Sequence, residues 1–208
     1  MRKIVKSRRQ PRKWTEYCCT PGVDYQASPE LREILLKEQG FICAYCMKGL
    51  DAEGKNTKIE HMKCRRLHPD LKFKYRNMVV CCSGDTFGFR HCDTSKGDED
   101  ISFDLLSDPF FTTLTYGLGT GTIKSSVASW DNEINNLLNL NNEYLKRERL
   151  AVLQAAIDTL DKNKNWNETQ SELTRLRDEW DQMDKGGRYK QFCGIVVYFL
   201  NKRLSRCI

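Results

Sequence analysis

The residues of this chain best equipped for chemistry are cysteines and polar side chains interleaved between positions 43 and 96. Two pairs of cysteines have the spacing of a structural zinc site, in which four thiolates hold the ion tetrahedrally. The four are Cys43, Cys46, Cys82 and Cys92. Nine residues separate the second pair, so we expect that segment to loop out, and Cys81 or His91 is an alternative member of it.

The polar residues of the same stretch are the groups that hydrolysis of a phosphodiester bond requires. His61 can serve as the base that activates water, because imidazole titrates near neutrality. Glu60 and Asp93 offer hard oxygen ligands that suit Mg²⁺ or Mn²⁺, and His91 is an alternative to Asp93 as the last ligand. Asn77 can fix the His61 ring through its side-chain carbonyl.

Positive charge is concentrated in the half of the chain that carries these motifs. The net charge of the 208 residues is +6, and residues 1–100 hold 20 Lys and Arg against 14 Asp and Glu. Excess positive charge beside a hydrolytic site favours a polyanionic substrate, although a solvated basic surface is the alternative. The candidate contacts to nucleic acid are Lys63, Arg65, Arg66 and Lys96.

The ten cysteines and the absence of a secretory signal lead us to expect a cytoplasmic protein with metal-bound rather than disulfide-bonded thiols. No run approaches the ~18 apolar residues that span a bilayer. The remaining cysteines are expected to be small buried hydrophobes. They are Cys18, Cys19, Cys64, Cys81, Cys193 and Cys207.

The elements that must position these residues predict an α+β fold. A basic arm over 1–26 precedes a helix that Ser28 caps and Gly40 ends. Short strands are expected at 56–61 and 77–81, separated by a loop over 63–75, and Asp93 opens a short helix that Gly97 curtails. Further strands are expected at 110–116 and 120–124, and the glycines of 117–121 form a hairpin turn rather than a phosphate loop. Helices follow over 127–138, 141–161, 169–183 and 189–204.

These motifs resemble those of the HNH nucleases over residues 41–98, with Glu60-His61, Asn77 and Cys92-Asp93-x2-Lys96 in the family's order. The resemblance implies a ββα-metal core in which Glu60 and Asp93 hold a catalytic Mg²⁺ or Mn²⁺, His61 activates water and Asn77 orients it. The four cysteines would hold a separate zinc ion. The chain departs from the family in having Asp93 where histidine or asparagine is usual, and in the long spacing between Cys82 and Cys92.

A narrower resemblance extends beyond the motif, to the HNH subunit of the Septu anti-phage systems and of related retron-associated systems. It rests on the basic arm with Pro11, on His91 to Asp98, and on Leu138-Asn139-Leu140-Asn141. It implies a defence role and a partner ATPase of the ABC/SMC type. We expect DNA as the favoured substrate of the nuclease, with RNA or tRNA as the alternative. The implied organisation is an arm and helix over 1–40, a nuclease core over 41–100 and a partner-docking region over 101–208. A zinc-stabilised module that binds nucleic acid or protein without catalysis is the competing interpretation.

Overall fold

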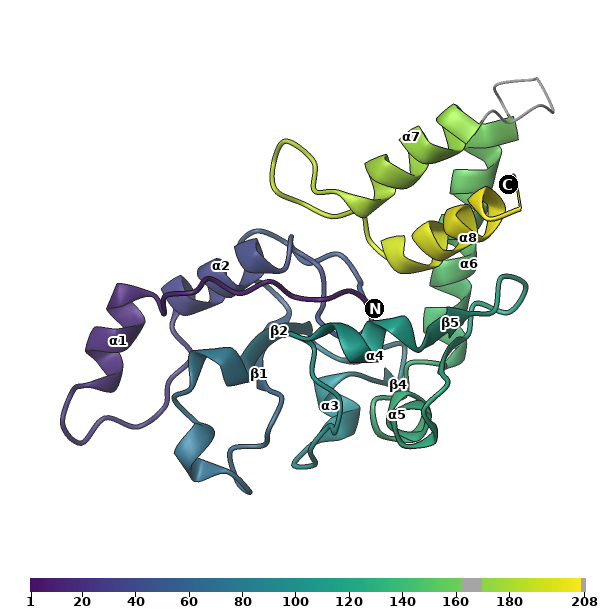
Figure 1. The fold of residues 1–208 in the computed structure, drawn as a ribbon. Helices are drawn as coiled ribbons and strands as arrows, with labels where there is room; N and C mark the ends of the chain where they lie inside the picture. The colour runs from purple at the N-terminus through teal and green to yellow at the C-terminus, as the bar shows by residue number, and fades with distance from the viewer. Residues whose placement is uncertain (162–169, 207–208) are drawn as a thin grey trace.

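The computed structural model of the protein describes residues 1–161 and 170–206, and it has the predicted α+β composition (Figure 1). Within these residues, the strands form three separate two-stranded antiparallel sheets. Among the described residues, no helix has the length and apolarity that crossing a bilayer would require. Cys207 and the predicted helix start at position 169 lie outside the described residues.

The N-terminal arm is more regular than expected, because it contains helix α1 (Arg12–Cys18). Trp14 anchors this helix: it is buried, and its indole N–H donates to the carbonyl oxygen of Phe73 at 3.1 Å. A single buried aromatic gives too little periodicity to predict a helix from sequence. Helix α2 (Pro29–Glu38) follows as predicted, and Ser28 caps it by accepting a hydrogen bond from the Leu31 amide at 3.1 Å.

A small β-hairpin and a short helix form the centre of the motif region. Strand β1 (Thr57–His61) pairs antiparallel with β2 (Met78–Cys82), so that Thr57 lies opposite Cys82 and His61 opposite Met78. Helix α3 (Asp93–Lys96) follows. The loop between β1 and β2 contains two single 3-10 turns, η1 (Pro69–Leu71) and η2 (Tyr75–Asn77). The segment between Cys82 and Cys92 loops out as the hairpin of β3 (Asp85–Thr86) and β4 (Phe89–Arg90).

The middle of the chain agrees with the prediction in part. Strands β5 (Leu114–Tyr116) and β6 (Ile123–Ser125) pair, and the glycines between them form the predicted hairpin turn. The predicted strand start at Phe110 is wrong, because residues Asp108–Thr112 form helix α4. The Phe110 ring is buried and stacks on Phe103 at a centroid distance of 3.9 Å, which the helical turn allows. The next predicted helix forms as α5 (Ala128–Asn132) and the π-helical turn η3 (Glu133–Leu137).

After Asn142, the part of the chain that the structure describes forms three helices: α6 (Glu143–Asp161), α7 (Gln170–Asp181) and α8 (Cys193–Leu204). Asn142 caps α6, since its Oδ1 accepts from the Leu145 amide at 3.0 Å. Helix α8 begins later than predicted because Phe192 has a left-handed φ of 52°. These helices share a second apolar core, and Figure 1 shows them grouped away from β1 and β2. The first core holds buried residues between Met1 and Leu145 and also includes Phe192, which precedes α8.

Candidate functional site

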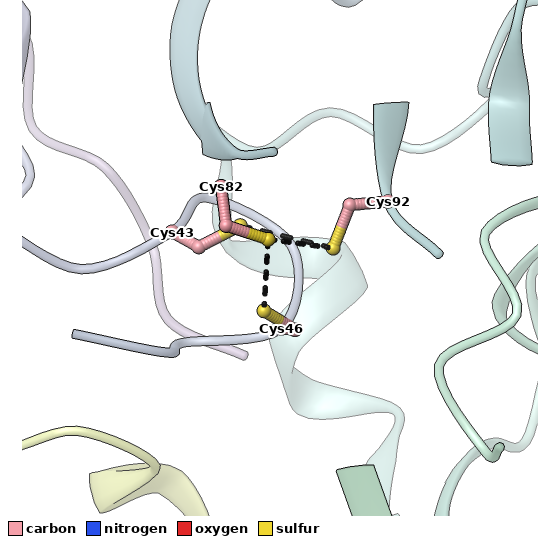
Figure 2. A group of neighbouring side chains, drawn as sticks. All are labelled: Cys43, Cys46, Cys82 and Cys92. Atoms are coloured by element: carbon pink, nitrogen blue, oxygen red, sulfur yellow. Dashed lines mark hydrogen bonds between the residues drawn. The ribbon is translucent and has the colours of Figure 1, made fainter. Parts of the chain in front are cut away.

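The four predicted cysteines converge on one point in the interior (Figure 2). All four are buried, and their sulfur atoms lie within 4.8 Å of one another. Three of the pairs are 3.8 Å apart: Cys43 with Cys92, Cys46 with Cys82, and Cys82 with Cys92. Thiolates at ~2.3 Å from a tetrahedral zinc ion would be separated by ~3.8 Å. The cluster therefore has the size and the ligand chemistry that a structural zinc ion requires.

The first cysteine pair lies on a tight turn that is fastened to β2. The Met47 amide donates to the Cys43 carbonyl at 3.0 Å, and Met47 has a φ of 66° that closes the turn. Gln39, which is buried at the end of α2, bonds to the backbone on both sides. Its amide nitrogen donates to the carbonyl oxygens of Ile42 and Val80, and its Oε1 accepts from the Val80 amide at 2.6 Å. Sequence reasoning missed Gln39, because a glutamine at a helix end gives no sign of burial.

The second pair is held by a turn that lies about 50 residues later in the chain. The Cys92 amide donates to the Leu138 carbonyl at 2.9 Å, and the side-chain amide of Asn139 donates to the Arg90 carbonyl at 2.7 Å. Cys92 itself has a φ of 54°, a conformation that costs a non-glycine residue free energy unless its surroundings impose it. The turn at residues 138–139 thus fixes the last cysteine of the cluster.

His91 belongs to the cysteine cluster, which corrects its proposed place as a catalytic metal ligand. It is fully buried, with Nε2 at 3.6 Å from the sulfur of Cys82 and Nδ1 at 2.8 Å from the Phe89 carbonyl oxygen. One ring nitrogen therefore faces the sulfur of Cys82, and the other faces a backbone carbonyl oxygen. Cys81 is buried as well, but it is not one of the four sulfurs that converge.

A separate cleft of about 710 Å³ opens where β1 ends and α3 begins. It is lined by four of the residues that the motif predicted: Glu60, His61, Asp93 and Lys96. Asn77, His91 and Lys63 do not line it. The structure therefore brings together the histidine and both carboxylates, and leaves the amide outside.

The two carboxylates of the cleft are close neighbours. Glu60 is buried, its Oε1 accepts from the Tyr45 hydroxyl at 3.2 Å, and it forms an ion pair with Lys96 at 2.7 Å. Burial raises the pKa of Glu60 to about 8, and a hydrogen bond to the neighbouring Asp93 carboxyl contributes to the rise. The charge of Lys96 acts in the opposite direction. Asp93 also lies 3.4 Å from the Lys58 amine. Two carboxyl groups this close favour a proton or a cation between them, and their hard oxygen atoms suit Mg²⁺ or Mn²⁺.

The His61 ring is oriented by the backbone of the loop. Its Nε2 lies 2.9 Å from the carbonyl oxygen of Lys72, and the Tyr25 ring meets it edge-on at a centroid distance of 4.8 Å. A carbonyl oxygen only accepts, so Nε2 carries the proton and the neutral ring keeps a free electron pair on Nδ1. Burial lowers the pKa of His61 to about 4, which favours the neutral ring at physiological pH.

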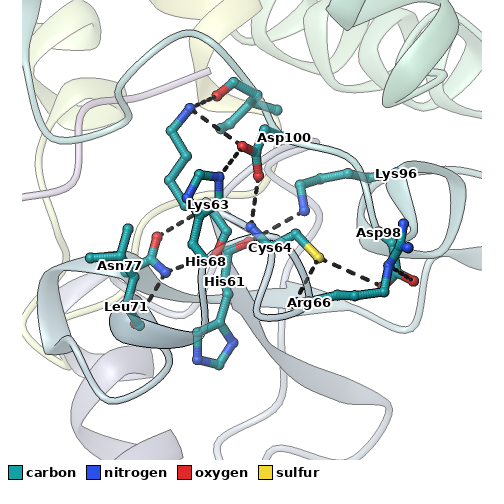
Figure 3. A network of polar contacts seen from close by, with 11 residues as sticks. His61, Lys63, Cys64, Arg66, His68, Leu71, Asn77, Lys96, Asp98 and Asp100 are labelled. Carbon is teal, nitrogen blue, oxygen red and sulfur yellow. Dashed lines mark hydrogen bonds and ion pairs between the residues drawn. The ribbon is translucent and has the colours of Figure 1, made fainter.

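Asn77 has a different role from the one predicted, since it braces the loop and does not bond to the His61 ring (Figure 3). Its Oδ1 accepts from the Lys63 amide at 2.8 Å, and its Nδ2 donates to the carbonyl oxygens of Lys63 at 2.9 Å and Leu71 at 3.3 Å. These bonds close the loop that carries Lys72. Asn77 therefore orients His61 indirectly, through the backbone that holds its Nε2.

The four residues predicted to contact nucleic acid differ in whether their cations are already engaged by other groups of the protein. The Lys63 amine is engaged outside the cleft, where it donates to the Ile101 carbonyl at 2.9 Å. Arg66 lines the cleft but pairs with Asp98 at 2.8 Å, and Lys96 is buried against Glu60. Arg65 lines the cleft with its guanidinium 4.7 Å above the Tyr25 ring. Of the four, Arg65 is the one that forms no ion pair among the described residues.

Comparison with known proteins adds no further assignment. No protein-family model matches the chain. No curated protein matches it either.

Proposed function

We propose that this protein is a metal-dependent endonuclease of the HNH type, which hydrolyses phosphodiester bonds of nucleic acid in the cleft at the end of β1. The observation that carries the proposal is a histidine with a free Nδ1 beside two adjacent carboxylates in a cleft rich in arginine and lysine. The order of a β-hairpin and a short helix around that cleft is the arrangement that the HNH resemblance implies.

In this proposal His61 acts as the general base. Its Nδ1 removes a proton from the attacking water, and the Lys72 carbonyl stabilises the resulting imidazolium through Nε2–H. The ion pair with Lys96 opposes the rise in the pKa of Glu60 and so favours the ionised carboxylate that a metal ligand needs. Glu60 and Asp93 would hold a Mg²⁺ or Mn²⁺ ion, which supplies charge neutralisation to the phosphate oxygens.

Zinc in the cysteine cluster would have a structural role. All four sulfurs are buried and every ligand position of a tetrahedral ion is filled by protein, which is the pattern of closed structural sites. The cluster joins the turn of residues 43–46, the end of β2 and the start of α3. Bound zinc would therefore fix the hairpin and the short helix that present His61 and Asp93.

The wider biological role is proposed from the Septu-like resemblance alone. It implies an anti-phage effector that works with an ABC/SMC-like ATPase, and the helical group of α6, α7 and α8, with its own apolar core, is the natural docking region. Co-expression with an ATPase encoded beside this chain, followed by purification through either subunit, tests it. Recovery of both proteins in a fixed ratio supports the role, and separate elution contradicts it.

The nuclease proposal is tested by incubating plasmid DNA and total tRNA with the zinc-loaded protein and Mg²⁺ or Mn²⁺. Wild type is compared with His61→Ala and with His68→Gln, a control at a histidine that bonds to Asp100 and does not line the cleft. Loss of cleavage in His61→Ala alone, with zinc content unchanged, supports a nuclease and identifies its substrate class. Binding of nucleic acid by all three proteins without cleavage would favour the zinc-stabilised binding module.

A further inference from the structure

The cleft contains two buried polar atoms that find no hydrogen-bond partner among the described residues: the hydroxyl oxygen of Tyr25 and Nε of Arg32. Buried polar groups in proteins are nearly always satisfied, so an unsatisfied pair in one cleft calls for an explanation. Both residues lie before position 41, outside the segment that resembles the HNH motif. A ligand that enters the cleft would supply the missing partners.

The ion pairs within the cleft also indicate where a ligand would bind. Its lining includes four acidic side chains, and each pairs with one base: Glu60 with Lys96, Asp93 with Lys58, Asp98 with Arg66, and Asp24 with Lys72. Two guanidinium groups of the lining, Arg32 and Arg65, form no ion pair of their own among the residues that the structure describes, although the charge of Arg65 also acts on Asp24, the partner of Lys72. The cleft therefore keeps two unneutralised positive charges of the kind that binds phosphate oxygens in a fork.

Arg65 and Tyr25 are held close to each other and to His61, and the charge of Arg32 acts on the Tyr25 hydroxyl. The Arg65 guanidinium lies 4.7 Å above the Tyr25 ring, and the edge of that ring contacts His61. Arg32 projects from the first turn of α2, and its aliphatic stem packs on Gly54. A Cβ at Gly54 would lie 2.6 Å from Cδ of Arg32, and Gly54 has a φ of 71°, so this contact requires glycine. The arginine is thus fixed in place by the fold rather than left free in solvent.

We propose that Arg32, Arg65 and the Tyr25 hydroxyl form a phosphate seat, which binds a backbone phosphate of the nucleic-acid substrate beside His61. This inference rests on the proposed function for the identity of the ligand, and it adds Tyr25 and Arg32 to the substrate-binding residues. All three groups can donate hydrogen bonds, and the two guanidinium groups can only donate, which suits a phosphate that only accepts. The seat contacts no base, so it contributes affinity without sequence preference.

The seat is tested by equilibrium binding of a fluorescein-labelled oligonucleotide, single-stranded and duplex, to the zinc-loaded protein without added Mg²⁺, Mn²⁺ or chelator, on a His61→Ala background. Arg32→Met, Arg32→Lys and Tyr25→Phe are compared with Arg175→Met, a control at an exposed arginine of α7. We expect Arg32→Met to weaken binding about 10- to 100-fold and Tyr25→Phe about 3- to 10-fold, as loss of a charged and a neutral hydrogen bond would. Arg32→Met should also reduce the slope of log K against log salt by about 1, while Arg175→Met changes neither value.

The outcomes separate this inference from the nuclease proposal. Weakened binding in Arg32→Met and Tyr25→Phe supports the seat even if the wild-type protein cleaves nothing. If His61→Ala abolishes cleavage while Arg32→Met and Tyr25→Phe bind and cleave like wild type, the nuclease stands and the seat is refuted. Zinc content and the thermal midpoint are measured for every variant. Should Arg32→Met not fold, Tyr25→Phe decides alone, because it removes a single unbonded oxygen: unchanged affinity refutes the seat.

Discussion

Replacing Asn77 should destabilise the protein by an amount that its three hydrogen bonds define. Asn77→Ala removes the acceptor of the Lys63 amide and the donor to two carbonyl oxygens, at a site where Asn77 is 7% exposed. At about 1 kcal/mol for each bond, the free energy of unfolding should fall by about 3 kcal/mol. For a domain of this size, that loss corresponds to a decrease in thermal midpoint of roughly 6–12 °C.

Asn77→Asp makes the test sharper because it preserves the shape of the side chain. The carboxylate keeps the bond from the Lys63 amide but faces the carbonyl oxygens of Lys63 and Leu71 without a proton to donate. Protonation would restore one donor, so the folded state should hold that proton more tightly than the unfolded chain does. The variant is therefore expected to lose most stability above neutral pH and to recover part of it near pH 5.

The assay is thermal unfolding followed by circular dichroism at pH 5.5 and pH 8, with Asn136→Ala as the control. Asn136 is exposed, and its amide bonds only to the side chain of Asn132 among the described residues, so its loss should change stability by less than about 0.5 kcal/mol. A thermal midpoint of Asn77→Ala within 2 °C of wild type would refute the loop-bracing role. An Asn77→Asp variant without the expected pH dependence would contradict the assignment of donor and acceptor.

Three further predictions follow from the cysteine cluster, a buried lysine and the carboxylate pair. Cys46→Ser, or treatment with a strong zinc chelator, should remove one zinc ion per chain by metal analysis and abolish cooperative unfolding, whereas Cys19→Ser at an exposed cysteine should change neither. Burial lowers the pKa of Lys6 to about 8 despite its pairing with Glu38, so the unfolded chain binds more protons between about pH 8 and 10.5. Between pH 7.5 and 10, the free energy of unfolding of wild type should therefore rise by on the order of 2 kcal/mol relative to that of Lys6→Met, as measured by denaturant titration. A difference between the two proteins that does not change with pH would contradict this prediction. Glu60→Gln should weaken Mn²⁺ binding about 10-fold or more by calorimetry without releasing zinc, and loss of both ions together would contradict two separate sites.

The sequence predicted the groups whose partners are close along the chain or are fixed by ligand chemistry. The four cysteines could be recognised because a tetrahedral ion needs four soft ligands, and Cys43-x2-Cys46 is one of the tight turns that supply two of them. The apolar run Met78-Val79-Val80 marked strand β2, and Ser28 marked the start of α2 by its capping chemistry. In each case, local rules were sufficient.

The remainder of the site depends on contacts between residues far apart in the chain, which carry no local signal. Tyr25 lies in a segment without periodicity, and it reaches His61 only because the arm folds against the β1–β2 loop. Asn77 was assigned to the His61 ring by residue type, but the closure of the loop directs its amide to Lys63 and Leu71. His91 and Asp93 were equivalent in sequence, and the reversal of the chain at Cys92 sends one to the thiolates and the other to Glu60.

The most direct test of the central claim, that His61 is the general base of a metal-dependent nuclease, is chemical rescue. His61→Gly, loaded with zinc and supplied with Mn²⁺, is assayed for nicking of supercoiled plasmid in increasing imidazole at constant ionic strength. The account predicts that the variant is inactive alone and that imidazole, by entering the space left by the ring, restores cleavage in a saturable manner that follows the fraction of neutral imidazole. Wild-type rates in the unsupplemented variant, or an inactive variant that retains zinc and its fold but is not rescued, would contradict it.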